Sequence, residues 1–252
     1  SEITALVTPE SNQRAIREGT PRHWRHCGGY NLERLRPDSP LDLAALVCGS
    51  EGTLALMTQI VVRLALLPGH SGMVLLAFDD LHAALSAVPE ILDTEPTAVE
   101  LLDTLSLLLC LGVPEYARQL ATVVAGRPHC LLIIEYSGES EAAVTQGVEL
   151  LRRRLPAGRA GVTEFTLASR AEQQAAVWSV RKAGLGLLSS MKGEMKPVPF
   201  VEDAAVPVAD LPAYIARLEE FCAGLDTPIS YYAHASAGCL HVRPLVNLRS
   251  AA

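Results

Sequence analysis

Two histidines near the end of the chain are the residues best suited to do chemistry. His234 and His241 are seven residues apart, which on one continuous strand would put them on opposite faces. A turn over residues 236–239 would change this, because folding about its midpoint sets the two histidines directly across from each other, with Cβ atoms about 5 Å apart on one face. Two imidazoles at that separation can share a divalent metal ion. The alternative is that one or both are ordinary core or surface histidines with satisfied hydrogen bonds.

An arginine in the longest helical segment is the second candidate. Arg181 lies three residues after Trp178 and four after Val177, so it borders the apolar stripe of the helix. An arginine aimed that way suits an anion, and a carboxylate offers two oxygens for a bidentate pair. The alternatives are an arginine that reaches solvent along its aliphatic stem, or one that pairs with an internal acid. For the downstream acids Glu202-Asp203 we favour a helix N-cap or an ion-pair partner.

A loop flanked by glycines is the third candidate. In Gly49-Ser50-Glu51-Gly52-Thr53, the two glycines allow a tight turn whose backbone amides can approach another group closely. Such a loop can hold a nucleotide or a flavin against the end of a strand or helix. An ordinary structural turn explains the spacing equally well.

The elements that position these residues follow from the apolar pattern. Strands or extended segments are predicted over 58–66, 73–78, 98–102, 129–136, 161–167, 198–206, 229–234 and 239–246. Helices are predicted over 81–92, from 104 onward, and over 116–124, 141–155, 171–188 and 209–225. The helix over 171–188 is expected to be interrupted near Gly184 and Gly186. Because several pairings look local, we expect an α+β fold with a largely antiparallel sheet and helices on one face.

Composition excludes several classes of function. The 252 residues carry a net charge of −7 with one basic run at residues 152–154, so nucleic acid is not expected as a partner. No apolar run approaches the roughly 20 residues that span a bilayer, and no secretory signal is expected. The six cysteines, without a Cys-x-x-Cys pair, encode no iron–sulfur cluster and are expected to be mostly reduced, buried thiols of a cytoplasmic protein. The leucines of residues 101–111 belong to the core or to a subunit contact, and a contact would make a homodimer.

The glycine loop and its surroundings resemble a known family. Gly-Ser-Glu-Gly-Thr-Leu followed by an apolar strand looks like the closing segment of the FAD domain in flavoenzymes of the vanillyl-alcohol-oxidase type, and residues 28–32 look like the segment before it. One departure is Ala55, where the family more often has glycine. Residues 1–70 are therefore expected to be the incomplete C-terminal tail of an FAD-binding domain. The resemblance implies that the flavin is contacted by Gly49, Ser50, Glu51, Gly52 and Thr53.

The histidine segment resembles that of the FAD-linked 2-hydroxyacid dehydrogenases. Their common motif, Gly-His-x-Gly-Asp-Gly-x-x-His, holds a divalent metal that orients the hydroxyl and carboxylate of the substrate. Here Ser236-Ala237-Gly238 replaces Gly-Asp-Gly, and the Cys-Leu-His-Val-Arg-Pro ending is more like the large, iron–sulfur-fused branch. The resemblance implies zinc or manganese on His234 and His241, with an iron–sulfur cluster only in a missing downstream domain. A further carboxylate ligand is expected in a Glu-His-Gly segment beyond Ala252.

The family also has a Trp-x-x-Arg helix and a Glu-Asp-x-x-Val-Pro segment similar to those of this chain. The resemblance assigns Arg181 to the substrate carboxylate and makes Lys196 and His241 further catalytic candidates. Residues 71–252 are then expected to be the FAD-linked oxidase C-terminal domain, which caps the flavin and binds the substrate, truncated at its end.

The reaction implied for the intact enzyme is oxidation of a D-2-hydroxyacid, of the lactate, glycolate or 2-hydroxyglutarate type, to the 2-oxoacid. Hydride would pass from the substrate to FAD, and the electron acceptor stays open. The metal would lower the pKa of the substrate hydroxyl, and a nearby base would take its proton. Without the lobe that grips the pyrophosphate, the chain alone is expected to be inactive and to bind no FAD. The alternatives are a non-redox FAD-dependent synthase of the same fold and a non-catalytic scaffold subunit.

Overall fold

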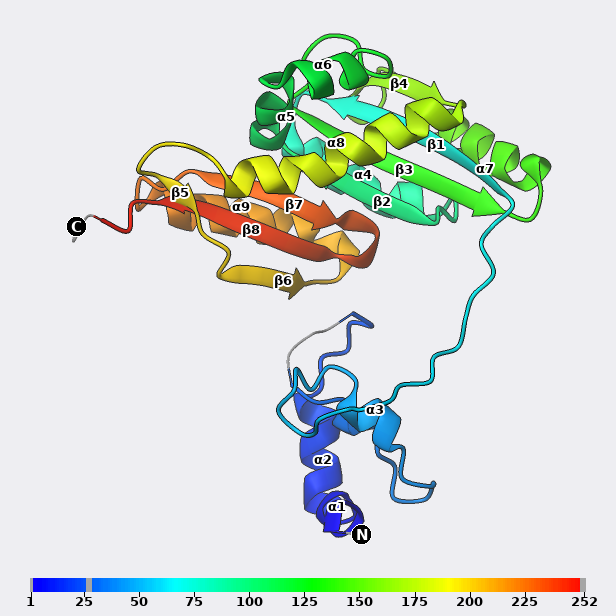
Figure 1. The fold of residues 1–252 in the computed structure, drawn as a ribbon, viewed down its shortest axis with the longest axis vertical. Coiled ribbons are helices and arrows are strands. Elements are labelled where there is room, and N and C mark those ends of the chain that lie inside the picture. The colour runs from blue at the N-terminus through cyan, green and yellow to red at the C-terminus, as the bar shows by residue number, and fades with distance from the viewer. Residues whose placement is uncertain (1, 26–28, 250–252) are drawn as a thin grey trace. The chain divides into compact units, whose positions relative to one another are not determined.

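The computed structural model describes residues 2–25 and 29–249 (Figure 1). Cys27 and Gly28 lie outside the described residues, as does Ala252. The chain forms two units, Ser1–Leu66 and Leu67–Ala252. Among the described residues, no helix combines the length and the apolar character needed to cross a bilayer.

The first unit is helical. It contains α1 (Glu2–Val7), α2 (Glu10–Gly19), the 3₁₀ turn η1 (Leu32–Arg34) and α3 (Leu43–Val47). Asp42 precedes α3, and its carboxylate accepts the backbone N–H of Ala45 at 2.9 Å and so caps the helix. A small apolar cluster holds these elements together, with Val7, Leu35 and Leu46 at its centre.

The strand predicted over residues 58–66 is wrong. This segment has no regular secondary structure, and its apolar side chains are exposed, Val61 by 90% and Leu66 by 98%. A strand needs a neighbour that takes its backbone hydrogen bonds, and no strand in the described part of the chain pairs with this segment. A composition rich in Ile and Val is therefore not sufficient to make a strand here.

The second unit is built on one sheet of eight strands (Figure 1). The strand order is β4-β1-β3-β2-β7-β8-β5, and β6 also pairs with β8. All pairings are antiparallel, in agreement with the largely antiparallel sheet that the sequence predicts. The strands are β1 His70–Phe78, β2 Ala98–Leu102, β3 Cys130–Gly138, β4 Val162–Ala168, β5 Lys196–Pro197, β6 Val201–Ala205, β7 Ile229–His234 and β8 Cys239–Val246.

Helices cover both faces of the sheet, and the prediction that they lie on one face is wrong. One face carries α4 (Leu81–Leu92), α7 (Glu141–Arg154) and α9 (Leu211–Ala223). The other face carries α5 (Thr104–Leu111), α6 (Pro114–Leu120) and α8 (Ala171–Ser189). The reason lies in the central strands, because every residue of 73–78 and of 130–134 is buried. Strands that are apolar on both sides must be covered on both sides.

Helix α8 runs without a break through Gly184 and Gly186, where the sequence predicts an interruption. Gly184 lies against α5, and a Cβ there would stand 3.8 Å from the side chains of Leu102 and Ser106. Tertiary packing of this kind offsets the roughly 1 kcal/mol that a glycine costs in a helix. The continuous helix carries Arg181 above the sheet.

Asp103, between β2 and α5, fixes strand β7 to the core. Its carboxylate accepts the N–H of Ser106 at 2.9 Å and so caps α5. It also accepts the hydroxyl of Ser230 at 2.7 Å and the N–H of Tyr231 at 2.8 Å. Three donors satisfy a carboxylate in a residue that is only 5% exposed. The strand that carries His234 is thereby held in place.

The described cysteines differ in their surroundings. Cys48 is exposed, and Cys110, Cys130, Cys222 and Cys239 are buried, as expected for most of them. Burial raises the pKa of the Cys110 thiol to about 11 and, with smaller contributions from nearby carboxylates, that of Cys130 to about 12. Both thiols are therefore protonated at neutral pH.

Candidate active site

The hairpin of β7 and β8 places His234 and His241 on one face of the sheet. Its register pairs His234 with Cys239 and Tyr232 with His241, so the histidines are diagonal neighbours. The predicted direct opposition is wrong because the turn is closed by residues 235–237 as a 3₁₀ turn and by Gly238, which is left-handed with φ of 62°. The two rings still meet edge to face, with centroids 5.4 Å apart.

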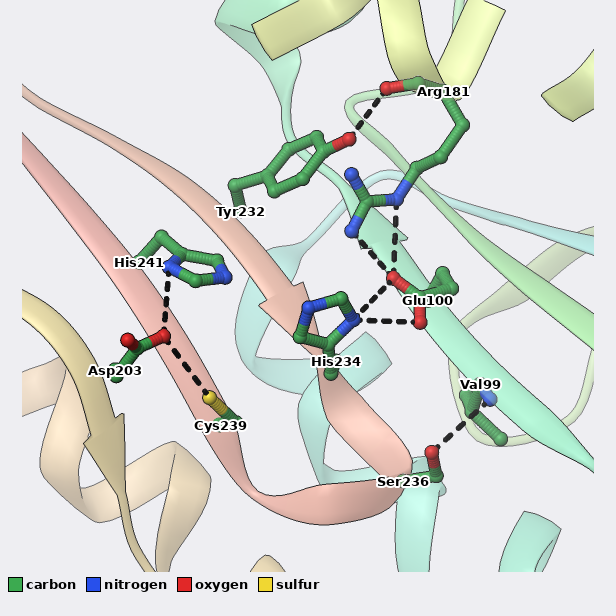
Figure 2. A network of polar contacts seen from close by, with 9 residues as sticks. All are labelled: Val99, Glu100, Arg181, Asp203, Tyr232, His234, Ser236, Cys239 and His241. Atoms are coloured by element: carbon green, nitrogen blue, oxygen red, sulfur yellow. Dashed lines mark hydrogen bonds and ion pairs between the residues drawn. The ribbon is translucent and has the colours of Figure 1, made fainter. Parts of the chain in front are cut away.

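Each histidine is held at Nδ1 by a carboxylate. Nδ1 of His234 donates to Oε1 and Oε2 of Glu100 at 2.8 and 3.0 Å (Figure 2). Nδ1 of His241 donates to Oε2 of Glu202 at 2.6 Å. Because an ionised carboxylate only accepts, each neutral ring carries its proton on Nδ1 and keeps a lone pair on Nε2. This is how carboxylates orient metal-binding histidines in proteins.

Glu100 joins His234 to Arg181, and it is not among the site residues predicted from the sequence. Its Oε2 accepts Nε of Arg181 at 3.1 Å and also Nη2 of the same guanidinium. Both residues are buried. Burial lowers the pKa of the Arg181 guanidinium, and the adjacent carboxylate of Glu100 opposes that change. The available signal was a lone acid in the apolar strand Ala-Val-Glu-Leu-Leu, since a buried charge needs a partner.

Tyr232 completes a contiguous cluster around Glu100 (Figure 2). The guanidinium of Arg181 lies over the Tyr232 ring, whose hydroxyl donates to the backbone carbonyl of Arg181. The same ring has its centroid 6.0 Å from that of His241. The structure therefore brings Arg181, His234 and His241 together. It shows Arg181 paired with an internal acid, and its role toward a substrate carboxylate stays a prediction.

The acids of β6 reach His241 through an irregularity in the sheet. The pairing of β6 with β8 shifts register between Val201 and Ala204, and Asp203 has φ of 51°. Such a bulge redirects side chains. Oδ1 of Asp203 lies 3.5 Å from Nδ1 of His241, and Glu202 forms an ion pair with Arg243 as well. The ion-pair interpretation of these acids is confirmed, and neither of them caps a helix.

Lys196 lies apart from this cluster. It pairs with Val246 of β8, five residues along the strand from His241, which corresponds to about 17 Å. Its Nζ donates to the backbone carbonyl of Met191 at 2.5 Å. The structure does not bring Lys196 together with the histidines, and its catalytic role stays a prediction.

The glycine loop of the first unit has a conformation that requires its glycines. Gly49 and Gly52 have φ of 79° and 76°, in the region that other residues rarely adopt. The N–H of Thr53 donates to the carbonyl of Ser50 at 2.9 Å and closes the turn. A Cβ at Gly52 would meet nothing within 4 Å, so a ligand could approach the backbone there. Contacts of residues 49–53, Glu51 included, with FAD stay a prediction.

Comparison with known proteins assigns the second unit to a family. Residues 67–252 match the model of FAD linked oxidases, C-terminal domain. The chain therefore belongs to this family, and the matched region starts at the same residue as the second structural unit.

The curated relatives include D-2-hydroxyglutarate dehydrogenases of several bacteria. Those of Pantoea ananatis (strain AJ13355) and Escherichia coli (strain K12) are 32% and 33% identical over 96% and 92% of this chain. The glycolate oxidase subunit GlcD of Bacillus subtilis (strain 168) is 28% identical over 83% of it. The chain spans only 25%, 24% and 42% of the lengths of these three proteins.

Among solved structures, alkyldihydroxyacetonephosphate synthase has a similar fold. The TM-score is 0.56, with 19% identity over 85% of this chain and 44% of the synthase. At this identity the likeness concerns the fold alone.

Proposed function

We propose that the protein containing this chain oxidises a D-2-hydroxyacid to the 2-oxoacid, with FAD as redox cofactor and a divalent metal on His234 and His241. The observation that carries the proposal is the pair of imidazoles, 5.4 Å apart and each oriented at Nδ1 by a carboxylate. The relatives support the substrate class, because D-2-hydroxyglutarate and glycolate are both 2-hydroxyacids. We place D-2-hydroxyglutarate first, since the relatives with 32% and 33% identity carry that name.

The donor set fits a divalent metal. Two neutral imidazoles that each present Nε2 are ligands that zinc and manganese accept. Glu100 and Glu202 hold the rings and raise the basicity of the ligating nitrogens. His234 and His241 would hold the metal, which would supply polarisation of the substrate hydroxyl, and FAD would supply the hydride acceptor.

Arg181 would bind the substrate carboxylate. A guanidinium has five N–H donors, and the bonds from Nε and Nη2 to Glu100 leave both N–H groups of Nη1 and one of Nη2 for the substrate. The Tyr232 ring beneath the guanidinium fixes its plane. A 2-hydroxyacid carries its carboxylate and hydroxyl on neighbouring carbons. An arginine and a histidine on the same carboxylate of Glu100 are close enough to orient both groups at once.

The flavin would be contacted by the loop of residues 49–53 in the first unit. The left-handed glycines at both ends of its Ser-Glu pair and the open space above Gly52 support this proposal. The loop would then supply backbone N–H groups to the cofactor, as glycine-rich loops do for anionic ligands.

Anaerobic bleaching of the flavin tests the proposal in the flavin-loaded protein that contains this chain. One D-2-hydroxyacid from a panel of D- and L-acids should reduce the flavin. The reduction should slow at least about 100-fold in His234→Ala and His241→Ala. His82→Ala is the matched control, because His82 pairs with Glu219 on the opposite face of the sheet, and it should bleach at the parental rate.

Two outcomes would contradict the proposal. A bound flavin that no hydroxyacid reduces would favour a non-redox synthase of the same fold. A protein that binds no flavin under any loading condition would favour a scaffold subunit.

A further inference from the structure

A second set of metal-ligating side chains lies beside His241. Asp203, Cys239 and His241 each offer one ligand atom, and the three atoms lie within 4.8 Å of one another. Oδ1 of Asp203 is 3.5 Å from Nδ1 of His241 and 3.9 Å from Sγ of Cys239 (Figure 2). Asp203 and Cys239 have no role in the proposed function.

The backbone explains why these side chains meet. Cys239 and His241 are two residues apart on β8, so both point to the same face of the sheet. The bulge in β6 brings Asp203 across from the neighbouring strand. Cys239 is fully buried, the His241 side chain is 17% exposed and that of Asp203 is 50% exposed. The Cys239 sulfur is therefore shielded from water, whereas the Asp203 carboxylate is accessible to an ion from solvent.

We propose that Asp203, Cys239 and His241 form a thiolate-containing zinc site, which differs from the His234–His241 site but shares His241 with it. Zinc binds thiolate sulfur at about 2.3 Å, imidazole nitrogen at about 2.0 Å and carboxylate oxygen at about 2.1 Å, so neighbouring ligand atoms in a tetrahedral site are about 3.5 Å apart. Two of the distances in this cluster are already 3.5 and 3.9 Å. A soft thiolate selects zinc over magnesium, calcium or manganese.

The surrounding charges favour a dication. Asp203, Glu202 and a Cys239 thiolate would contribute three negative charges, and Arg243, which pairs with Glu202, contributes one positive charge. Oε2 of Glu202 lies 2.6 Å from Nδ1 of His241, so Glu202 or water can supply the fourth ligand. Binding releases the thiol proton of Cys239 to solvent.

The two sites compete for one ring. The proposed zinc uses Nδ1 of His241, whose proton then moves to Nε2. A neutral imidazole offers only one lone pair, so His241 cannot at the same time ligate a metal shared with His234. Zinc in the thiolate site therefore excludes metal from the histidine pair.

Cobalt(II) substitution tests the site without flavin or substrate. Co²⁺ added to the metal-free chain should produce a near-ultraviolet thiolate-to-cobalt charge-transfer band that saturates at one equivalent. The band should disappear in Cys239→Ser and in Cys239→Ala. It should persist in Cys222→Ser, which removes another buried thiol in α9. Asp203→Asn should weaken cobalt binding at least about tenfold, and zinc should displace the cobalt and abolish the band.

His234→Ala separates this site from the histidine pair, because the band should survive that substitution. If the band were lost in His234→Ala, the Cys239 thiol would ligate the metal of the His234–His241 pair, and the proposal would be overturned. Cobalt binding without a charge-transfer band, a band that persists in both Cys239 variants, or no cobalt binding at all would overturn it as well. Far-ultraviolet circular dichroism of each variant establishes that loss of the band is not loss of the fold.

Discussion

Glu135 is an acid placed where its charge is unfavourable. It lies on β3 opposite Ala98, on the same sheet face as Glu100. Burial raises the pKa of the Glu135 carboxyl, and the negative charge of Glu100 raises it further, while a hydrogen bond with Trp178 opposes both. The folded protein therefore holds the Glu135 proton more tightly than the unfolded chain does.

The resulting prediction concerns stability against pH. Because the pKa of Glu135 is raised in the folded state, its contribution to the free energy of unfolding is fully present below the unfolded pKa of about 4.5. This contribution is lost as pH rises through the folded pKa. Glu135→Gln cannot lose a proton, so its free energy of unfolding should fall less over this window. Urea midpoints at pH 4, 5.5 and 7 measure this. Parallel curves for the two proteins would contradict the prediction.

Local sequence motifs identify some residues of the site and not others. His234, His241 and Arg181 stand in motifs of local spacing, and the structure brings these three together. Glu100 could not be found in this way, because it meets His234 across 134 positions of sequence, through the pairing of β2 with β7. Lys196 is a candidate through the family resemblance alone, without any spacing that places it near the histidines, and it lies away from the cluster.

At the scale of elements, two glycines in helices have opposite surroundings. Gly147 of α7 packs on Tyr136 of β3, and a Cβ there would stand 2.6 Å from the ring. Gly186 of α8 has open space where a Cβ would be, with nothing within 4 Å. The same substitution should therefore act in opposite directions at the two positions.

We expect Gly147→Ala to destabilise the protein by about 1–3 kcal/mol, because overpacking outweighs the gain in helix propensity. Gly186→Ala should stabilise it by up to about 1 kcal/mol, since only the propensity changes. Urea denaturation measures both, and each variant serves as the control for the other. Equal midpoints would show that the contact between α7 and Tyr136 is not tight.

The predicted helices and strands agree with the structure where neighbouring residues determine them. The bounds of α4, β2, β7 and β8 coincide with those expected from periodicity and turn residues. The strand predicted over 58–66 is wrong because a strand depends on a partner, and composition does not report one. The cover on both faces of the sheet also depends on distant segments. It could have been inferred from the unbroken apolar runs of the central strands.

At the scale of the whole molecule, the joint between the two units is exposed. Residues 51–71 are all exposed to solvent, and Arg63 lies among them without regular structure. An extended, accessible segment between packed units is where proteases cut first.

Limited trypsin digestion should therefore cleave early after Arg63. Of the 252 residues, 189 follow that position, so the product of the 27.0 kDa chain should be a resistant fragment of about three quarters of its mass. Arg63→Gln is the matched control and should delay this fragment. If trypsin cleaved within residues 67–252 as fast as it cleaves after Arg63, the second unit would not be a stably folded unit.

A single carboxylate, that of Glu100, accepts hydrogen bonds from both Arg181 and His234. Under the proposed function, this shared acceptor would make substrate binding and metal binding cooperative. A substrate carboxylate bound to Arg181 would draw the guanidinium away from Glu100. Glu100 would then be a stronger hydrogen-bond acceptor for Nδ1 of His234, and Nε2 of that ring would be a better metal ligand. Linkage requires the converse by the same factor, so metal on the histidine would raise the affinity of the arginine for its anion. Substrate and metal would therefore favour each other's binding through a residue that neither of them touches.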